Sequence, residues 1–129
     1  MKAHFLILLP LIAVILICSS NSINKNDKKL VFDAVIDNGI YVIIDWHSHT
    51  IKTDQAITFF SKMAEKYKDY PNVIYEIFNK PETDSWSDVK TYSIKLIETI
   101  RAIDKGNFIL VGSPHWDQFD NSSICIFNR

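Results

Sequence analysis

Apolar residues along the chain fall into two patterns, short continuous runs and stripes at helical spacing. Three runs rich in β-branched residues predict strands buried on both faces: residues 40–44, 73–78 and 108–111. Stripes of helical period predict a helix before each strand: residues 28–38, residues 56–67 with Thr53 as the cap, and residues 89–103. Corresponding strand positions recur about every 32 to 35 residues, the length of a βαβ unit. Because right-handed crossovers bring such strands together in parallel, the predicted fold class is α/β.

The first twenty residues, 1–20, predict a cleavable signal peptide. Lys2 precedes an apolar stretch at residues 5–17 that only Pro10 interrupts, and small side chains follow at positions 18–20. This stretch is shorter than the roughly 20 residues that span a bilayer. The expected location is therefore secreted and extracellular, with no membrane association after cleavage. The polar residues 21–27 predict a linker to the folded part.

Composition narrows the function classes. The 129 residues are 47% hydrophobic and 22% charged, with a formal net charge of −1, which is typical of a globular protein. This balance offers no basic surface for nucleic acid. The two cysteines, Cys18 and Cys125, are too few for a disulfide scaffold. The length excludes a complete (β/α)8 barrel, which needs about 250 residues.

Polar and aromatic side chains follow the carboxyl end of each predicted strand, where parallel α/β folds place their chemistry. These segments are residues 45–49 (Asp-Trp-His-Ser-His), 79–81 (Asn-Lys-Pro) and 112–116 (Gly-Ser-Pro-His-Trp). Imidazole and carboxamide groups hydrogen-bond hydroxyls, and indole rings offer faces for stacking. The mixture suits a sugar, whereas each residue taken singly is also compatible with ordinary loop composition.

Four ordered blocks of sequence resemble glycoside hydrolase family 5, in its endo-β-1,4-glucanase (cellulase) branch: residues 39–47, 59–67, 71–81 and 109–118. The resemblance extends from about residue 34 to residue 118. It implies a partial (β/α)8 TIM barrel, about strands three to five with flanking helices. Residues 28–118 are then a fragment of that domain, and residues 119–129 a divergent tail without the continuing helix and sixth strand. Such a fragment leaves two open sheet edges.

The resemblance also implies a mechanism that this chain departs from. Family members retain anomeric configuration with two carboxylates, and the acid/base is the glutamate of an Asn-Glu-Pro motif ending barrel strand four. Here the motif reads Asn79-Lys80-Pro81. Lysine, with an ordinary pKa of about 10.4, stays cationic where an oxocarbenium-like transition state develops. The family's nucleophile belongs to strand seven, outside this chain, and Glu76 and Glu82 are poor substitutes for the acid. No catalytic residue is expected to be intact.

Three substrate-binding roles carry over from the resemblance. His47 matches the histidine ending strand three, Asn79 the asparagine that bonds the sugar 2-hydroxyl, and Trp116 an aromatic residue after strand five. Trp46, His49 and His115 are weaker candidates. The expected partner is a β-glucan polysaccharide or oligosaccharide, with no cofactor, no metal, no nucleic acid and no partner protein.

Two other interpretations remain open. A non-catalytic glucan-binding protein would use the same residues, and lysine at position 80 would tolerate binding while abolishing turnover. A zinc hydrolase would use His47 and His49, whose spacing suits a metal pair, with His115, Asp45 or Asp117.

Overall fold

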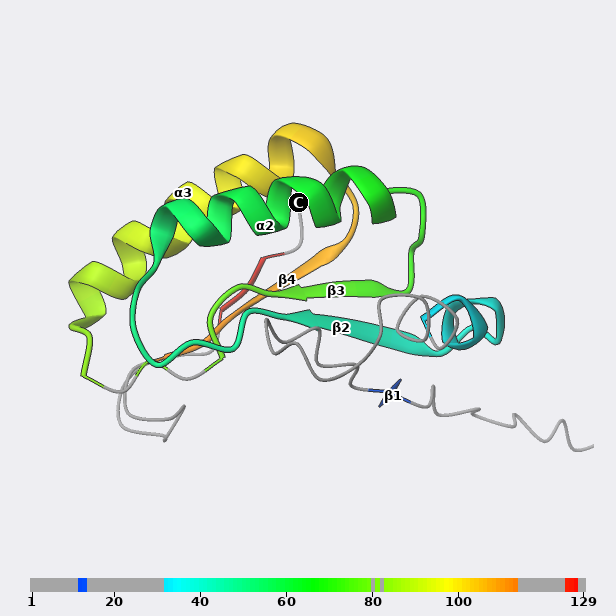
Figure 1. Cartoon of the computed structure of the whole chain (residues 1–129), viewed down its shortest axis with the longest axis horizontal. Coiled ribbons are helices and arrows are strands. Elements are labelled where there is room, and N and C mark those ends of the chain that lie inside the picture. The colour runs from blue at the N-terminus through cyan, green and yellow to red at the C-terminus, as the bar shows by residue number, and fades with distance from the viewer. Residues whose placement is uncertain (1–11, 14–31, 80, 82, 114–124, 128–129) are drawn as a thin grey trace, which may run out of the picture.

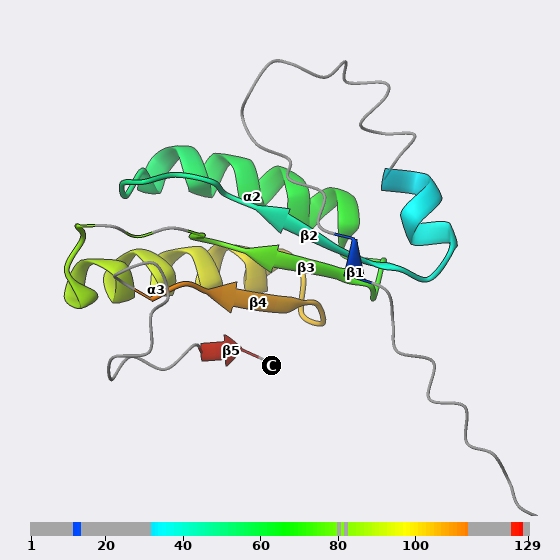
Figure 2. The same cartoon turned by 90° about the horizontal axis from the view of Figure 1, so that it is seen from below.

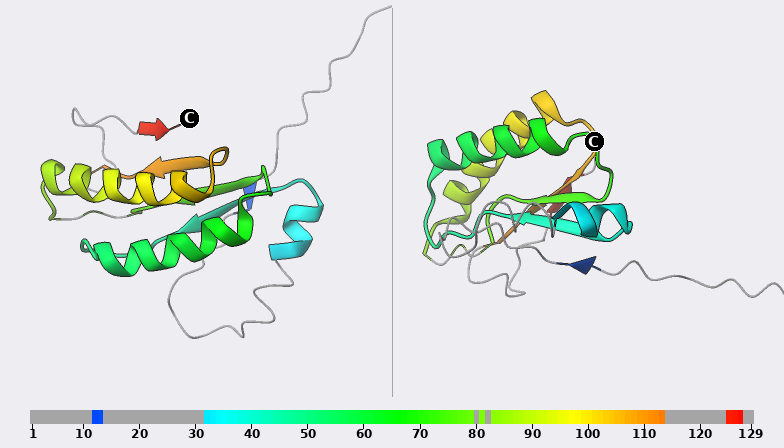
Figure 3. Two further views of the ribbon diagram at one scale, coloured as in Figure 1. Left: turned by 90° about the horizontal axis from the view of Figure 1, so that it is seen from above. Right: turned by 45° about the vertical axis from the view of Figure 1, so that its right-hand side comes forward.

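The computed structural model describes residues 12–13, 32–79, 81, 83–113 and 125–127, which form one sheet with helices on one face (Figure 1). The five strands lie in the order of the chain: β1 (Ile12–Ala13), β2 (Tyr41–Asp45), β3 (Val73–Glu76), β4 (Phe108–Val111) and β5 (Cys125–Phe127). Helices α2 (Thr53–Tyr67) and α3 (Trp86–Ile103) lie side by side above this sheet (Figure 3). A further helical segment covers residues 32–37.

The parallel α/β prediction is confirmed for the three predicted strands, which correspond to β2, β3 and β4. β2 pairs with β3 from Val42↔Val73 to Asp45↔Glu76, and β3 pairs with β4 from Ile74↔Phe108. β1 adds two residues to the other edge of β2, also in parallel. Figure 2 shows β2, β3 and β4 pointing the same way, with a helix connecting each to the next. This arrangement is part of a (β/α) barrel wall.

The strand β5 lies in the stretch predicted as a divergent tail, for which no strand was predicted. It runs antiparallel to β4, with Leu110 opposite Ile126. A parallel return needs a crossover of about a dozen residues or more, usually containing a helix, whereas an antiparallel return needs only a turn. Thirteen residues separate the two strands, close to the minimum for a crossover. The sheet is open and its outermost strands are β1 and β5, so β2 and β4 are each paired on both sides while the described sheet still has two edges.

Local signals explain where the helices begin and end. Gly39 adopts φ +69°, and the amides of Gly39 and Ile40 donate to the carbonyls of Ile36 and Val35, which completes a Schellman turn before β2. α3 begins three residues earlier than predicted, because the Ser85 hydroxyl accepts a hydrogen bond from the Asp88 amide at 3.2 Å and caps the helix. None of the described helices is long and apolar enough to cross a membrane.

The core lies between the sheet and the two helices. Alternate strand residues face the helices and are buried: Val42, Ile44, Val73, Tyr75, Ile109 and Val111. They meet the buried faces of α2 and α3, which include Phe60, Ala64, Leu96 and Ile100. This packing holds β2, β3 and β4 in register and so fixes the relative positions of the loops that leave them.

A buried hydrogen-bond network around Asp104 holds the turn between α3 and β4. Its carboxylate accepts hydrogen bonds from the Tyr75 hydroxyl at 2.8 Å and from the Asn107 side-chain amide at 2.8 Å. It also accepts bonds from the backbone amides of Gly106 and Asn107 at 2.9 and 3.1 Å. The Asp104 side chain is almost completely buried, and four donors satisfy it. The network ties the middle of β3 to the start of β4.

Two buried phenols make the fold sensitive to alkaline pH. Burial raises the pKa of Tyr75, and its bond to Asp104 raises it further; burial also raises the pKa of Tyr92. Because the folded state holds these protons more tightly than the unfolded state, their stabilisation is complete below about pH 10 and is lost as pH rises further. We expect the free energy of unfolding, measured by urea titration, to stay level up to about pH 10 and to fall as pH rises further.

The Tyr92→Phe variant should show a shallower fall over the same range. Replacing the exposed phenol of Tyr70 by phenylalanine is the matched control and should leave the slope unchanged. Equal slopes in the native chain, Tyr92→Phe and Tyr75→Phe would contradict this assignment.

Candidate functional site

The polar residues predicted as a site lie at the carboxyl ends of β2 and β3. Backbone bonds continue the ladder past these strands, since the Trp46 amide donates to the Glu76 carbonyl and the Ile77 amide to the Leu110 carbonyl, both at 3.0 Å. His47 and Asn79 follow directly on these adjacent strands. The fold thus brings them to the same end of the sheet, as the sequence predicted.

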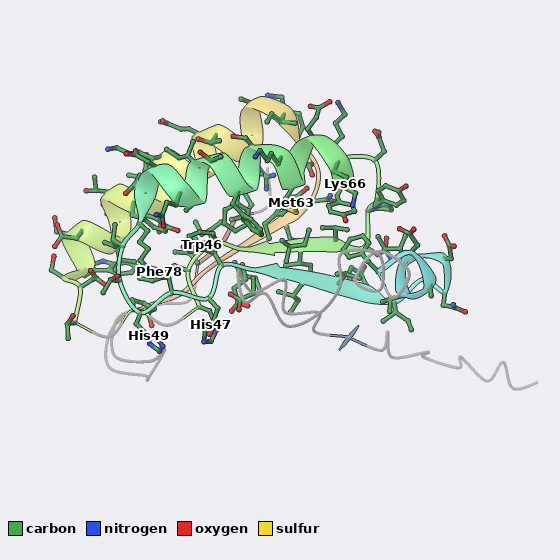
Figure 4. All side chains as sticks on the ribbon, viewed as in Figure 1. Trp46, His47, His49, Met63, Lys66 and Phe78 are labelled. Carbon is green, nitrogen blue, oxygen red and sulfur yellow. The ribbon has the colours of Figure 1, made fainter. Side chains whose placement is uncertain are left out.

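His47 is bonded to a carboxylate beneath it. Its Nδ1 lies 3.3 Å from Oδ2 of Asp45, the last residue of β2. The Asp45 side chain is completely buried, whereas 29% of the His47 side chain is exposed. Figure 4 shows His47 and His49 on the side of the sheet opposite the helices. The ring therefore has one anchored edge and remains partly accessible at the surface.

The loop after His47 has its own internal support. The hydroxyl of Ser48, which is buried, donates to the Thr50 carbonyl at 2.7 Å. His49 is exposed, and its ring centre lies 5.8 Å from that of His47, edge to face. The two imidazoles therefore form one small polar surface at the end of β2.

Trp46 faces the other way and belongs to the packing. Its ring lies 5.3 Å from the ring of Phe59 on α2, on the helix side of the sheet (Figure 4). Trp46 and His47 thus lie on opposite sides of the sheet and do not share one surface. This placement supports the structural interpretation of Trp46 over a role in stacking against a ligand.

Asn79 is positioned through α3. The Tyr92 hydroxyl donates to the Ile77 carbonyl at 2.7 Å, and the buried ring of Phe78 packs at 5.2 Å from the ring of Tyr92. These two contacts hold the chain just before Asn79, which is partly buried. Lys80, Glu82, His115 and Trp116 lie outside the described residues, so their predicted roles remain predictions.

The zinc alternative finds no further ligand in the part of the chain that the structure describes. No three His, Cys, Asp or Glu residues there are grouped so that they could hold a metal ion. His115 and Asp117, which the alternative also invokes, lie outside those residues. His47 instead has a carboxylate neighbour, which sequence reasoning treated only as a possible metal ligand. The spacing of Asp45 and His47 is the signal that could have revealed this contact, since residues two apart along a strand share a face.

A hollow outside the strand-end surface was also missed by sequence reasoning. It has a volume of about 340 Å³ and lies between the start of α2 and the first turns of α3. Its lining includes Thr53, Asp84, Asp88 and Lys95. No sequence motif connects these residues, so the sequence did not indicate the hollow. His47 and Asn79 are not among its lining residues.

Parallel βα units with polar side chains at the carboxyl ends of the strands are typical of a segment of a TIM barrel. The family model described as cellulase (glycosyl hydrolase family 5) matches residues 15–126. The chain therefore belongs to glycosyl hydrolase family 5, the cellulase family. This confirms the resemblance seen in the sequence and extends it beyond residues 34–118.

Individual relatives agree with this assignment. Endoglucanase Z of Dickeya dadantii is 50% identical over 98 residues, which cover 74% of this chain and 23% of that protein. An endoglucanase of Clostridium saccharobutylicum is 46% identical over 110 residues, covering 79% of this chain and 24% of its own. The catalytic domain of Thermobifida fusca endoglucanase Cel5A superposes with a TM-score of 0.62 at 35% identity, over 71% of this chain and 32% of that chain. The chain thus spans about a quarter of the length of these curated relatives and a third of the solved domain.

Proposed function

We propose that this chain is a cellulase-like segment that binds β-1,4-glucan at the ends of β2 and β3 but does not hydrolyse it as it stands. The observation that carries the binding proposal is the partly exposed, carboxylate-anchored His47 next to the strand that leads to Asn79. A relative supports the substrate class, since the Thermobifida fusca catalytic domain has been solved in complex with cellotetraose.

The chemistry of these groups fits a sugar. An imidazole nitrogen and a carboxamide hydrogen-bond hydroxyl groups, and His47 and Asn79 come from neighbouring strands held about 4.8 Å apart by the ladder. Trp116, matched to an aromatic residue of the family, would add a stacking face. His47 and Asn79 would bind the hydroxyls of a sugar ring, and Trp116 would stack against the apolar face of a sugar ring.

The sequence Asn79-Lys80-Pro81 supports the absence of hydrolysis. The reaction needs an acid that protonates the leaving oxygen and then, as a base, activates water. A lysine ammonium in this place is a poor acid at neutral pH and adds positive charge beside a developing cation. A bound glucan would therefore remain intact. Binding without turnover is the behaviour of a glucan-binding protein.

Titration with cellotetraose tests both halves of the proposal. We expect binding by calorimetry without release of reducing sugar. His47→Ala and Asn79→Ala should each weaken binding about three- to tenfold, because each removes one hydrogen bond to the sugar. The control is Tyr70→Ala, an exposed aromatic residue between α2 and β3, at the other end of the sheet. Absence of binding at millimolar cellotetraose would refute the first half, and reducing-sugar release the second.

Secretion is a separate part of the proposal. The supporting feature is the order of Lys2, the apolar residues 5–17 and the small residues 18–20. Cleavage after this segment would also remove β1, whose two residues pair with Tyr41 and Val42 at the edge of β2. We expect N-terminal sequencing of the exported chain to begin near residue 21; an exported or retained chain that still begins at Met1 would contradict cleavage.

A further inference from the structure

We propose that Asp45 is a positioning residue that keeps the proton of neutral His47 on Nδ1 and thereby presents Nε2 as a hydrogen-bond acceptor for a sugar hydroxyl. The sugar half of this statement rests on the proposed function, whereas the proton position does not. Nothing in the family resemblance of this sequence assigned Asp45 a role in binding.

The geometry between the two side chains is fixed by the sheet. Asp45 and His47 are two residues apart and so point to the same side of the strand, and Nδ1 lies 3.3 Å from the Asp45 carboxylate. Trp46 lies between them and is itself held in place: its backbone amide donates a hydrogen bond to the Glu76 carbonyl, and its ring packs against Phe59. Asp45 itself pairs in register with Glu76 and is completely buried. The backbone on both sides of the pair is thus fixed, and the Asp45 side chain is enclosed.

The shared proton belongs on the imidazole. An ionised carboxylate can only accept a hydrogen bond, so the nitrogen that faces it must carry the hydrogen. Once Nδ1 carries the proton, the neutral ring has a lone pair on Nε2 and no donor there. His47 then accepts from a hydroxyl of the sugar and cannot donate to it.

The consequence is a preference among ligands. A sugar hydroxyl can donate a hydrogen bond to Nε2 of His47. A ligand that offers only an acceptor at this point, such as an ether oxygen, cannot form a hydrogen bond with Nε2. A carboxylate that fixes the other nitrogen of a histidine is a general way to set its tautomer and orientation. The structure thus assigns the polarity of the His47 contact.

Nitrogen-15 NMR of the imidazole rings tests this directly. The chain has four histidines, and the signals of His47 are those that disappear in the His47→Gln variant. At about pH 8 we expect the Nδ1–H tautomer in the native chain. Asp45→Asn should keep it, because the amide oxygen still accepts a bond. Asp45→Ala should shift His47 mostly to Nε2–H, the tautomer that a free histidine prefers.

Two further variants keep the result interpretable. Asp45→Leu replaces the buried carboxylate by an apolar group of similar shape and takes the place of Asp45→Ala if the latter does not fold. Glu76→Gln removes the neighbouring carboxylate without touching the Nδ1 contact and should leave the tautomer unchanged. With cellotetraose, Asp45→Ala should weaken binding about as much as His47→Ala, and the double variant no further.

The possible failures are distinct. An Nε2–H tautomer in the native chain, or Nδ1–H that survives in Asp45→Ala and Asp45→Leu, would overturn the positioning role. A native chain that holds Nδ1–H but binds no cellotetraose would overturn the proposed function and leave the role of Asp45 intact.

Discussion

Replacing Asp104 by alanine is expected to lower the free energy of unfolding by roughly 3–5 kcal/mol. The change removes the acceptor of four hydrogen bonds and leaves the Tyr75 hydroxyl and the Asn107 amide groups buried without it. A buried donor that loses its acceptor costs about 1–3 kcal/mol. Because the network joins β3 to the start of β4, its loss should also loosen the register of the sheet. Urea unfolding followed by circular dichroism measures the effect.

Asp104→Asn provides the graded comparison. Asparagine keeps one acceptor oxygen for the backbone amides but turns a donor toward Tyr75 and Asn107, so about half the loss is expected. Asp88→Ala is the surface control, since this aspartate is exposed and its carboxylate accepts a hydrogen bond from the cap residue Ser85 on the same helix. Its effect should stay below about 1 kcal/mol. A loss in Asp104→Ala no greater than in Asp88→Ala would show that the network does not stabilise the fold.

Lysine in place of the motif glutamate is expected to abolish most of the activity of a full-length family member. In a relative that carries Asn-Glu-Pro, we expect the change to Asn-Lys-Pro to lower kcat by at least about 10²–10⁴, the usual contribution of general acid–base catalysis. The added positive charge opposes the oxocarbenium-like transition state and should lower kcat further. Initial rates of reducing-sugar release from a soluble glucan measure both effects.

Glutamine at the same position separates the two causes. It has the shape of glutamate and lacks both its proton and its charge, so its kcat reports the loss of proton transfer alone. The lysine variant should be slower than the glutamine variant, and its affinity for cellotetraose should change much less than its kcat. A lysine variant that retains at least a tenth of the parent rate would overturn the argument that Lys80 prevents hydrolysis in this chain.

The pairing of β5 with β4 affects how readily the β4 edge can pair with another chain. An unpaired edge next to a parallel core offers backbone groups to any other chain and favours aggregation. Here Cys125–Phe127 satisfies part of the β4 edge from within the same chain. In a complete barrel the next parallel strand would occupy that edge, so β5 and a sixth barrel strand would exclude each other.

The amino-acid sequence by itself determined the elements and the family. Continuous apolar runs and stripes of 3.6-residue period are local properties, so the runs at residues 40–44, 73–78 and 108–111 identified the three central strands to within two residues at each end. Ordered blocks of sequence identified the cellulase family, and a single letter, Lys80, showed the departure from its motif. The common location of His47 and Asn79 followed from the rule that parallel strands end at the same edge.

Only the tertiary structure decided which neighbours these residues have. It showed Trp46 packed on Phe59 rather than facing His47, Asp45 beneath His47 rather than beside a metal, and the tail paired in the opposite direction to the core strands. It also joined Tyr75 to Asp104, which are 29 residues apart in the chain. Such contacts depend on the register of strands and on the packing of helices across the sheet, which bring together residues that no local pattern relates.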